Sequence, residues 1–248
     1  NDQNLNFLGE MTSKDLDGLV YCLTHDPKDG KVRLTEELTE SPLYKLHHPD
    51  HHQYWQLIGA EIQCFGANTF VTMLRGGQGV EYKEVLIDVC DKLKVNYNKK
   101  AETEQIEHSL LMKILTDAIE KMSPEELKKL AAITGRNNTS GLTPQAMVGV
   151  FQAMFRAGGF RSYQLTVVVV NAVLKHLIGR GLPFTMTGPM LQALKVFSGP
   201  IGWAITGAWT AIDISGAAYR VTIPAVIQVA ALRQKHMYGE QADEASFG

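Results

Sequence analysis

Apolar residues recur every three or four positions along most of the chain, a spacing that is typical of amphipathic helices. We predict helices over residues 14–23, 53–74, 82–93, 103–121, 143–157, 163–178, 191–215 and 221–235, with a further helix that begins after Ser123. The pattern therefore indicates an all-α protein, a multi-helix bundle formed by one continuous domain or by two closely packed lobes.

Two helix starts carry strong local signals. Ser123 is placed to cap the helix that follows, Pro124 takes its first position, and Glu126 completes a capping box. Thr143 and Pro144 begin the next helix by the same logic.

The stretch from Tyr163 to Ile178 combines two conflicting signals. Val167–Val170 favours a strand locally, because β-branched residues fit a pleated surface well. The apolar run continues well beyond the length of a typical strand. We therefore predict a buried helix over this stretch.

Residues 181–232 form an apolar block that contains only three charged side chains, Lys195, Asp213 and Arg220. Its central part, residues 196–212, is 17 residues long and carries no charge. Such a run is borderline for spanning a bilayer, and it is also what a fully buried central helix looks like. We expect the second state in the resting protein, and that state does not exclude a later insertion into membrane.

We predict that this block folds as a buried, glycine-rich helical hairpin, with a break near Ser215. Small residues spaced four apart, such as Gly207 and Ala211, would let the backbones of neighbouring helices approach closely. Pro200 is expected to kink the first helix, and Pro224 is expected to lie in the first turn of the second. The residues on which we expect the hairpin to depend are Gly199, Pro200, Gly202, Trp203, Gly207, Trp209, Ala211, Asp213, Arg220 and Pro224.

Charge divides the chain unevenly. Residues 1–162 carry 40 charged side chains, whereas residues 163–248 carry ten. We interpret residues 1–135 as an amphipathic helical region, 136–142 as a linker, 143–235 as the apolar helical region, and 236–248 as a polar tail.

Composition argues against several classes of protein. A net charge of −2 and the lack of aromatic residues interleaved with arginines argue against binding to nucleic acid. The three cysteines are far apart and show no CxxC spacing, which favours a reducing cytoplasm. The polar N-terminus lacks the layout of a signal peptide. We expect a cytoplasmic protein, with a peripheral position at the inner membrane as a further expectation.

Candidate chemistry is sparse. His47, His48, His51 and His52 include two pairs with the i, i+4 spacing that lets two imidazoles share a metal ion on a helix. Pro49 interrupts such a helix, so the favoured interpretation is a polar helix start without metal. We find no motif for a nucleophile, a phosphate loop or a cofactor, and we predict a protein that is not an enzyme and needs no cofactor.

Several segments resemble one bacterial family, the YaaW-like proteins, over nearly the whole chain. The segments that carry the resemblance are Leu5–Thr24, Tyr54–Ile58, Leu86–Asn98, Gly199–Trp203 and Tyr219–Ala230. Members carry the loose label of ubiquinol–cytochrome c chaperone-like proteins. The resemblance therefore implies a helper in the assembly of a respiratory complex, and it supplies no catalytic residues.

From these observations we predict a non-enzymatic protein that associates with or inserts into membrane lipid through the apolar hairpin, in the manner of helical pore-formers, with an oligomer on the membrane as a further expectation. Residues 1–162 would supply a soluble shell and a surface for a protein partner. The alternative is a soluble chaperone or assembly factor that binds apolar helices of a partner protein.

Overall fold

The computed structural model describes residues 2–26, 29–33, 36–69, 80–134, 140–210 and 218–239. In these ranges the regular elements are helices, and a single antiparallel bridge joins His25 to Val32. The elements are η1 (Gln3–Glu10), α1 (Ser13–Thr24), α2 (Pro42–His47), η2 (His51–Tyr54), α3 (Trp55–Thr69), α4 (Tyr82–Lys92), α5 (Thr103–Ile119), α6 (Pro124–Ile133), α7 (Pro144–Ala157), α8 (Gly159–Leu177), α9 (Gly188–Thr210) and α10 (Tyr219–Tyr238). The all-α, multi-helix fold predicted from the spacing is confirmed.

The predicted helix starts are also confirmed where local chemistry determines them. The Ser123 hydroxyl accepts a hydrogen bond from the Glu126 N–H, and the Glu126 carboxylate accepts one from the Ser123 N–H, which together form a capping box. Thr143 caps α7 in a similar way. The valine-rich stretch is helical and begins at Gly159, before the predicted start. Part of the predicted 136–142 linker lies outside the described residues.

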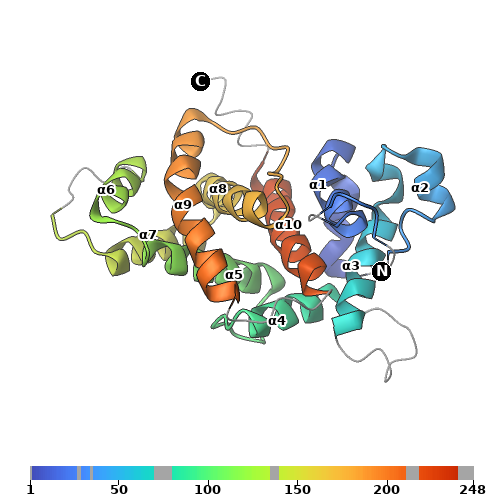
Figure 1. The fold of residues 1–248 in the computed structure, drawn as a ribbon, viewed down its shortest axis with the longest axis horizontal. Coiled ribbons are helices and arrows are strands. Elements are labelled where there is room, and N and C mark those ends of the chain that lie inside the picture. Colours follow the sequence, from blue (N-terminus) through green and yellow to red (C-terminus); the bar gives the residue numbers. More distant parts are fainter. Residues whose placement is uncertain are drawn as a thin grey trace.

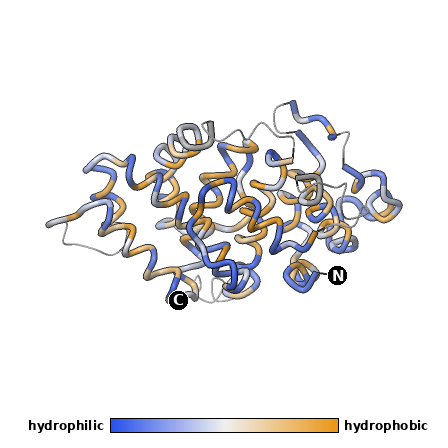
Figure 2. The backbone as a smooth tube through the Cα atoms, turned by 90° about the horizontal axis from the view of Figure 1, so that it is seen from below, coloured by the Kyte–Doolittle hydropathy of each residue, from blue (hydrophilic) through white to orange (hydrophobic). Residues whose placement is uncertain are grey.

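The C-terminal helix, α10, lies at the centre of the molecule. It packs against α8, α1, α4, α5, α3 and η1, so it contacts elements from both ends of the chain (Figure 1). Residues 221–232 of α10 are all buried. Figure 2 shows apolar backbone segments gathered inside the molecule and hydrophilic segments toward its outside.

Gly18 in α1 allows α1 and α10 to approach each other closely. A Cβ atom at Gly18 would lie 2.8 Å from Oε1 of the buried Gln228 in α10, which is closer than real side chains allow. A side chain at position 18 would therefore have to displace the amide of Gln228.

The predicted hairpin is corrected in three respects. Helix α8 packs against both α9 and α10, whereas the described residues of α9 and α10 make no extensive contact with each other. One face of α9 is open to solvent, so only the α10 half of the pair is fully buried. Pro224 lies in the second turn of α10 and not in the first, because the helix begins at Tyr219.

Polar side chains near the end of α10 hold it to the N-terminal elements. The Arg233 guanidinium donates to the carboxylate of Glu107 over 2.8 Å, and the Glu107 side chain is only 2% exposed. The hydroxyl of Tyr82 donates to the same carboxylate over 2.7 Å. Arg233 also donates to the carbonyl of Asn4 and lies over the ring of Phe7.

We expect the substitution Arg233→Met to lower the free energy of unfolding by about 3 kcal/mol, because it leaves the buried Glu107 carboxylate without its partner. Adding Glu107→Gln should recover part of this loss, since a neutral amide still accepts from Tyr82. Urea titration of the two single variants and the double variant measures the coupling.

The exposed pair Lys45–Glu40 provides the control, and Lys45→Ala should leave the unfolding midpoint unchanged. A loss in the double variant equal to the sum of the losses in the two single variants would mean that the pair does not act as a unit.

Candidate functional site

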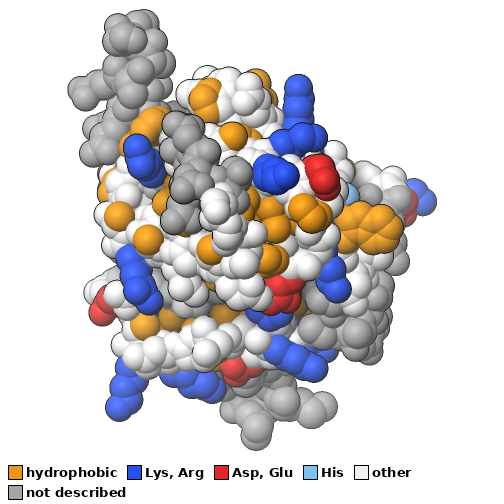
Figure 3. Space-filling view, turned by 90° about the vertical axis from the view of Figure 1, so that its left-hand side faces the viewer, with side chains coloured by type: hydrophobic (Ala, Val, Ile, Leu, Met, Phe, Trp, Pro, Cys, Tyr) orange, Lys and Arg blue, Asp and Glu red, His pale blue; other side chains and the backbone are white. Residues whose placement is uncertain are grey.

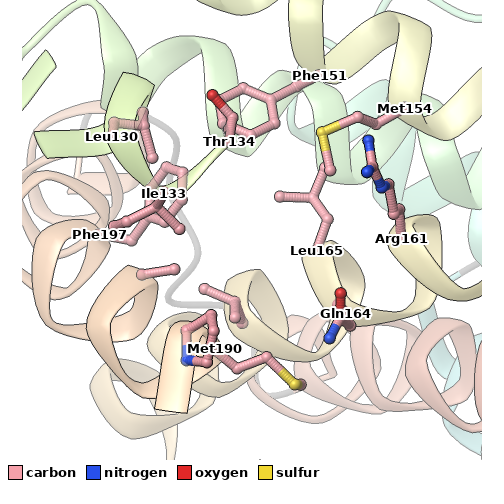
Figure 4. A pocket seen from close by; sticks show the side chains of 13 residues that line it. Leu130, Ile133, Thr134, Phe151, Met154, Arg161, Gln164, Leu165, Met190 and Phe197 are labelled. Atoms are coloured by element: carbon pink, nitrogen blue, oxygen red, sulfur yellow. The ribbon is translucent and has the colours of Figure 1, made fainter. Parts of the chain in front are cut away.

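An apolar cleft opens between four helices of the second half of the chain. It has a volume of about 90 Å³. Its apolar walls come from α6, α7, α8 and α9, and they include Leu130, Ile133, Phe151, Met154, Leu165, Met190, Ala193 and Phe197 (Figure 4). We call this space the apolar cleft.

The floor of the apolar cleft is buried and aromatic, and its rim is open. Phe151 and Phe197 are each 1% exposed, and their rings meet edge to face with centroids 5.8 Å apart. Arg161 lies at the rim and is exposed. Figure 4 shows its guanidinium beside the thioether of Met154.

This lining can bind an apolar group but offers no obvious catalysis. Among the described residues that line the cleft, Arg161 is the only charged one, and no carboxylate, imidazole or thiol faces it there. Methionine side chains, here Met154 and Met190, adapt to differently shaped apolar partners. This cleft is not predicted from the sequence, because helical spacing identifies its residues only as core residues.

The predicted hairpin residues of α9 divide between two faces of that helix. Pro200 and Gly202 are buried, whereas Gly199, Trp203 and Gly207 lie on the exposed face. The Trp203 side chain is 73% exposed. The predicted close helix contact is not found at Gly207, because a Cβ atom there would meet no described atom within 4 Å.

The close contact in α9 occurs instead at Gly202. A Cβ atom at this position would lie 2.4 Å from the imidazole ring of His176 in α8. Nε2 of His176 lies 2.9 Å from the carbonyl oxygen of Ser198, so a hydrogen bond holds the ring against the α9 backbone. Gly202 therefore permits the crossing of α8 and α9.

The remaining hairpin residues lie apart from the apolar cleft. Pro224 is buried inside α10, and Arg220 lies in its first turn. The side chain of Trp209 and residues Ala211 and Asp213 lie outside the described residues. Among the helices described, none combines the length and the apolar character that crossing a membrane requires.

The histidine cluster is used for local contacts. α2 ends at His47, as the proline predicted, and His51 begins a separate short element. His51 is buried, with Nδ1 2.5 Å from the Tyr54 hydroxyl and Nε2 3.4 Å from the Asp17 carboxylate, and burial lowers its pKa. Nδ1 of His52 lies 3.1 Å from the Met11 carbonyl oxygen. Within the described ranges, no three His, Cys, Asp or Glu side chains are placed to hold a metal ion.

A second, polar cleft of about 700 Å³ lies between α5 and α7. His108 lines it and stacks on Phe155, with ring centroids 4.9 Å apart. Burial lowers the pKa of His108, and the carboxylate of Glu104, 3.7 Å from Nε2, acts in the opposite direction. The imidazole is therefore largely neutral near pH 7.

Two buried carboxyl groups lie together near α3. Glu36 and Glu61 are 7% and 6% exposed, and the Glu61 carboxylate accepts a hydrogen bond from the Glu37 N–H over 3.2 Å. The pKa of Glu61 is raised to about 7, mainly by burial; the hydrogen bond from the Glu37 N–H lowers it, and the charges of Glu36 and Glu37 add to the rise.

Comparison with known proteins shows which family the chain resembles. A family model described as "Ubiquinol-cytochrome C chaperone" matches residues 50–227, and one described as "Domain of unknown function (DUF3944)" matches residues 1–34. A UPF0174 protein of Helicobacter pylori strain J99 is 48% identical over 98% of this chain and 94% of its own length. The UPF0174 protein YaaW of Escherichia coli K12 is 35% identical, over 94% of each chain.

The chain belongs to the YaaW-like UPF0174 family. The resemblance seen in the sequence is thereby confirmed. The 50–227 match contains the whole apolar cleft, whereas Arg233 and its contacts to Asn4 lie outside it. No solved structure matches the chain.

The two glycines of α9 should respond differently to the same substitution. We expect Gly202→Leu to lower the free energy of unfolding by about 1–3 kcal/mol, because the new side chain must displace His176 from its place on α9. Gly207→Leu should change it by no more than about 0.5 kcal/mol, since the site is open. Urea unfolding of both variants tests this, and equal effects would contradict the assigned faces.

We expect Glu61 to make the protein less stable as the pH rises from about 4.5 to about 7. Over this range the folded state retains a proton that the unfolded state has released, so the loss reaches about 3 kcal/mol and then levels off. Glu61→Gln should remove most of this decline, as measured by urea unfolding at pH 5 and pH 8. The exposed Glu125→Gln is the control, and an unchanged slope in Glu61→Gln would refute the assignment.

Proposed function

We propose that the protein is a non-enzymatic chaperone or assembly factor that holds an apolar helical segment of a partner protein in the apolar cleft. The observation that carries this proposal is the cleft itself, with a buried aromatic floor, adaptable methionines and an open rim. The description of the matching family as a ubiquinol–cytochrome C chaperone supports the same function.

The size of the cleft indicates what it would hold. Since a cavity of about 150 Å³ accommodates benzene, a space of about 90 Å³ suits one aliphatic side chain from a helix lying across the rim. Burial of one such side chain contributes about 1.5–3 kcal/mol, which favours transient binding of the kind that a chaperone needs. Arg161 at the rim would favour a segment with an acidic residue beside its apolar face.

The insertion of an α9–α10 hairpin into membrane is the weaker of the two functions considered. Release of α10 would uncover the core on all sides and separate Arg233 from Glu107. The sequence predicted a surface for a protein partner within residues 1–162. In this proposal α6 and α7 come from that region, and α8 and α9 complete the apolar cleft.

The test uses a labelled 18-residue peptide, a leucine- and alanine-rich helix flanked by glutamates, with binding followed by fluorescence anisotropy. We expect Ala193→Leu, which fills the apolar cleft, to weaken binding by about tenfold or more, equivalent to losing one buried aliphatic side chain. Thermal unfolding should establish that the variant remains folded.

Ala153→Leu is the matched control, because it makes the same chemical change at an exposed position of α7. It should bind the peptide as the unsubstituted protein does. Equal binding by both variants would exclude the apolar cleft as the site, and no binding by the unsubstituted protein would refute the proposed function.

A further inference from the structure

Charge is segregated along the chain and in space. Residues 121–207 contain nine of the 24 basic residues and only two of the 26 acidic ones. Within this range lie α6, α7, α8 and most of α9, which we call the basic lobe (residues 124–207). Figure 3 looks onto this side of the molecule and shows many Lys and Arg side chains spread over it, with few Asp and Glu.

Most of these positive charges are not neutralised within the protein. Lys129, Arg156, Arg161 and Lys195 are exposed, and none of them forms an ion pair with another described residue. Their field is therefore available to an external anionic partner.

The most exposed aromatic side chain of the basic lobe is Trp203, at 73% exposure. Gly199 and Gly207, one turn before and one turn after it, leave open space around the indole. From residue 188 to residue 207, Lys195 is the only charged residue of α9. The outer face of α9 thus presents an unshielded indole and a cation, with no acidic residue.

A shallow groove beside Trp203 continues this surface. It has a volume of about 590 Å³ and lies between α6 and α9, with Lys129 and Lys195 in its lining together with Val196 and Gly199. We call it the α6–α9 groove. It carries two cations against one carboxylate, that of Glu126.

We propose that the basic lobe docks on an anionic lipid membrane, with Trp203 in the headgroup region and with Lys129 and Lys195 facing lipid phosphates. Tryptophan favours the interface between water and lipid, because its ring is amphipathic. Cations spread over a whole face suit a lipid surface, where each basic residue contributes without a fixed partner geometry. The helices remain packed, so this docking differs from insertion of a hairpin, and it goes beyond the proposed chaperone function.

The experiment measures co-flotation of the full chain with vesicles of phosphatidylcholine alone or with 30% phosphatidylglycerol. We expect binding to be at least tenfold tighter to the anionic vesicles and to be lost in 0.5 M NaCl. Trp203→Ala should weaken binding by about tenfold, and Lys129→Glu with Lys195→Glu by tenfold or more.

Matched controls lie outside the basic lobe. Leu46→Ala removes an apolar side chain that is also 73% exposed, and Lys31→Glu with Lys100→Glu reverses two charges. Both should bind vesicles as the unsubstituted protein does. Ala193→Leu should also keep vesicle binding while it loses the peptide, so the two proposals can fail separately.

Equal binding to neutral and anionic vesicles would overturn the proposal, and so would equal losses in the lobe variants and in the controls. If the protein ignores vesicles but binds polyglutamate or a single-stranded oligonucleotide through Lys129 and Lys195, the face recognises another polyanion and the membrane assignment is wrong.

Discussion

The ion pair between Arg233 and Glu107 fixes the C-terminal helix, α10, against α5 in the middle of the chain. α10 is buried through residues 221–232, and apolar packing alone would tolerate a shift of this helix along its axis. Arg233 opposes such a shift, because moving the guanidinium away would leave the buried Glu107 carboxylate without its opposite charge. Tyr82 and Asn4 complete the set, so α4, α5 and η1 all depend on the position of one residue of α10.

The placement of α10 in turn leaves α9 on the outside of the molecule. Because α8 occupies the space beside α10, α9 covers α8 with one face and turns the other to solvent. The inner face brings Ala193 and Phe197 to the apolar cleft, and the outer face carries Trp203. One helix therefore joins the two proposed surfaces, and a protein docked through its outer face would keep the cleft close to the lipid surface.

The sequence predicted those features that local chemistry controls. The capping box at Ser123 needs only residues three apart, and the helical state of residues 163–178 follows from the length of the run. The hairpin is not confirmed, because periodicity shows that a face is apolar but does not show which helix covers it. Gly207 illustrates this limit, since the small-residue spacing was real but its face meets solvent.

The two candidate surfaces were hidden from the sequence for different reasons. The apolar cleft needs residues from four helices, and Phe151 and Phe197 become neighbours only when α7 and α9 pack together. The uneven distribution of charge is present in the sequence, but dividing the chain at residue 162 does not reveal it. That division groups the acidic first 120 residues with the basic residues of α6 and α7. Counting the charged residues helix by helix separates the acidic first 120 residues from the basic helices. The fold converts that segregation along the chain into segregation in space, because α6, α7, α8 and α9 contact one another on one side of the molecule (Figure 1).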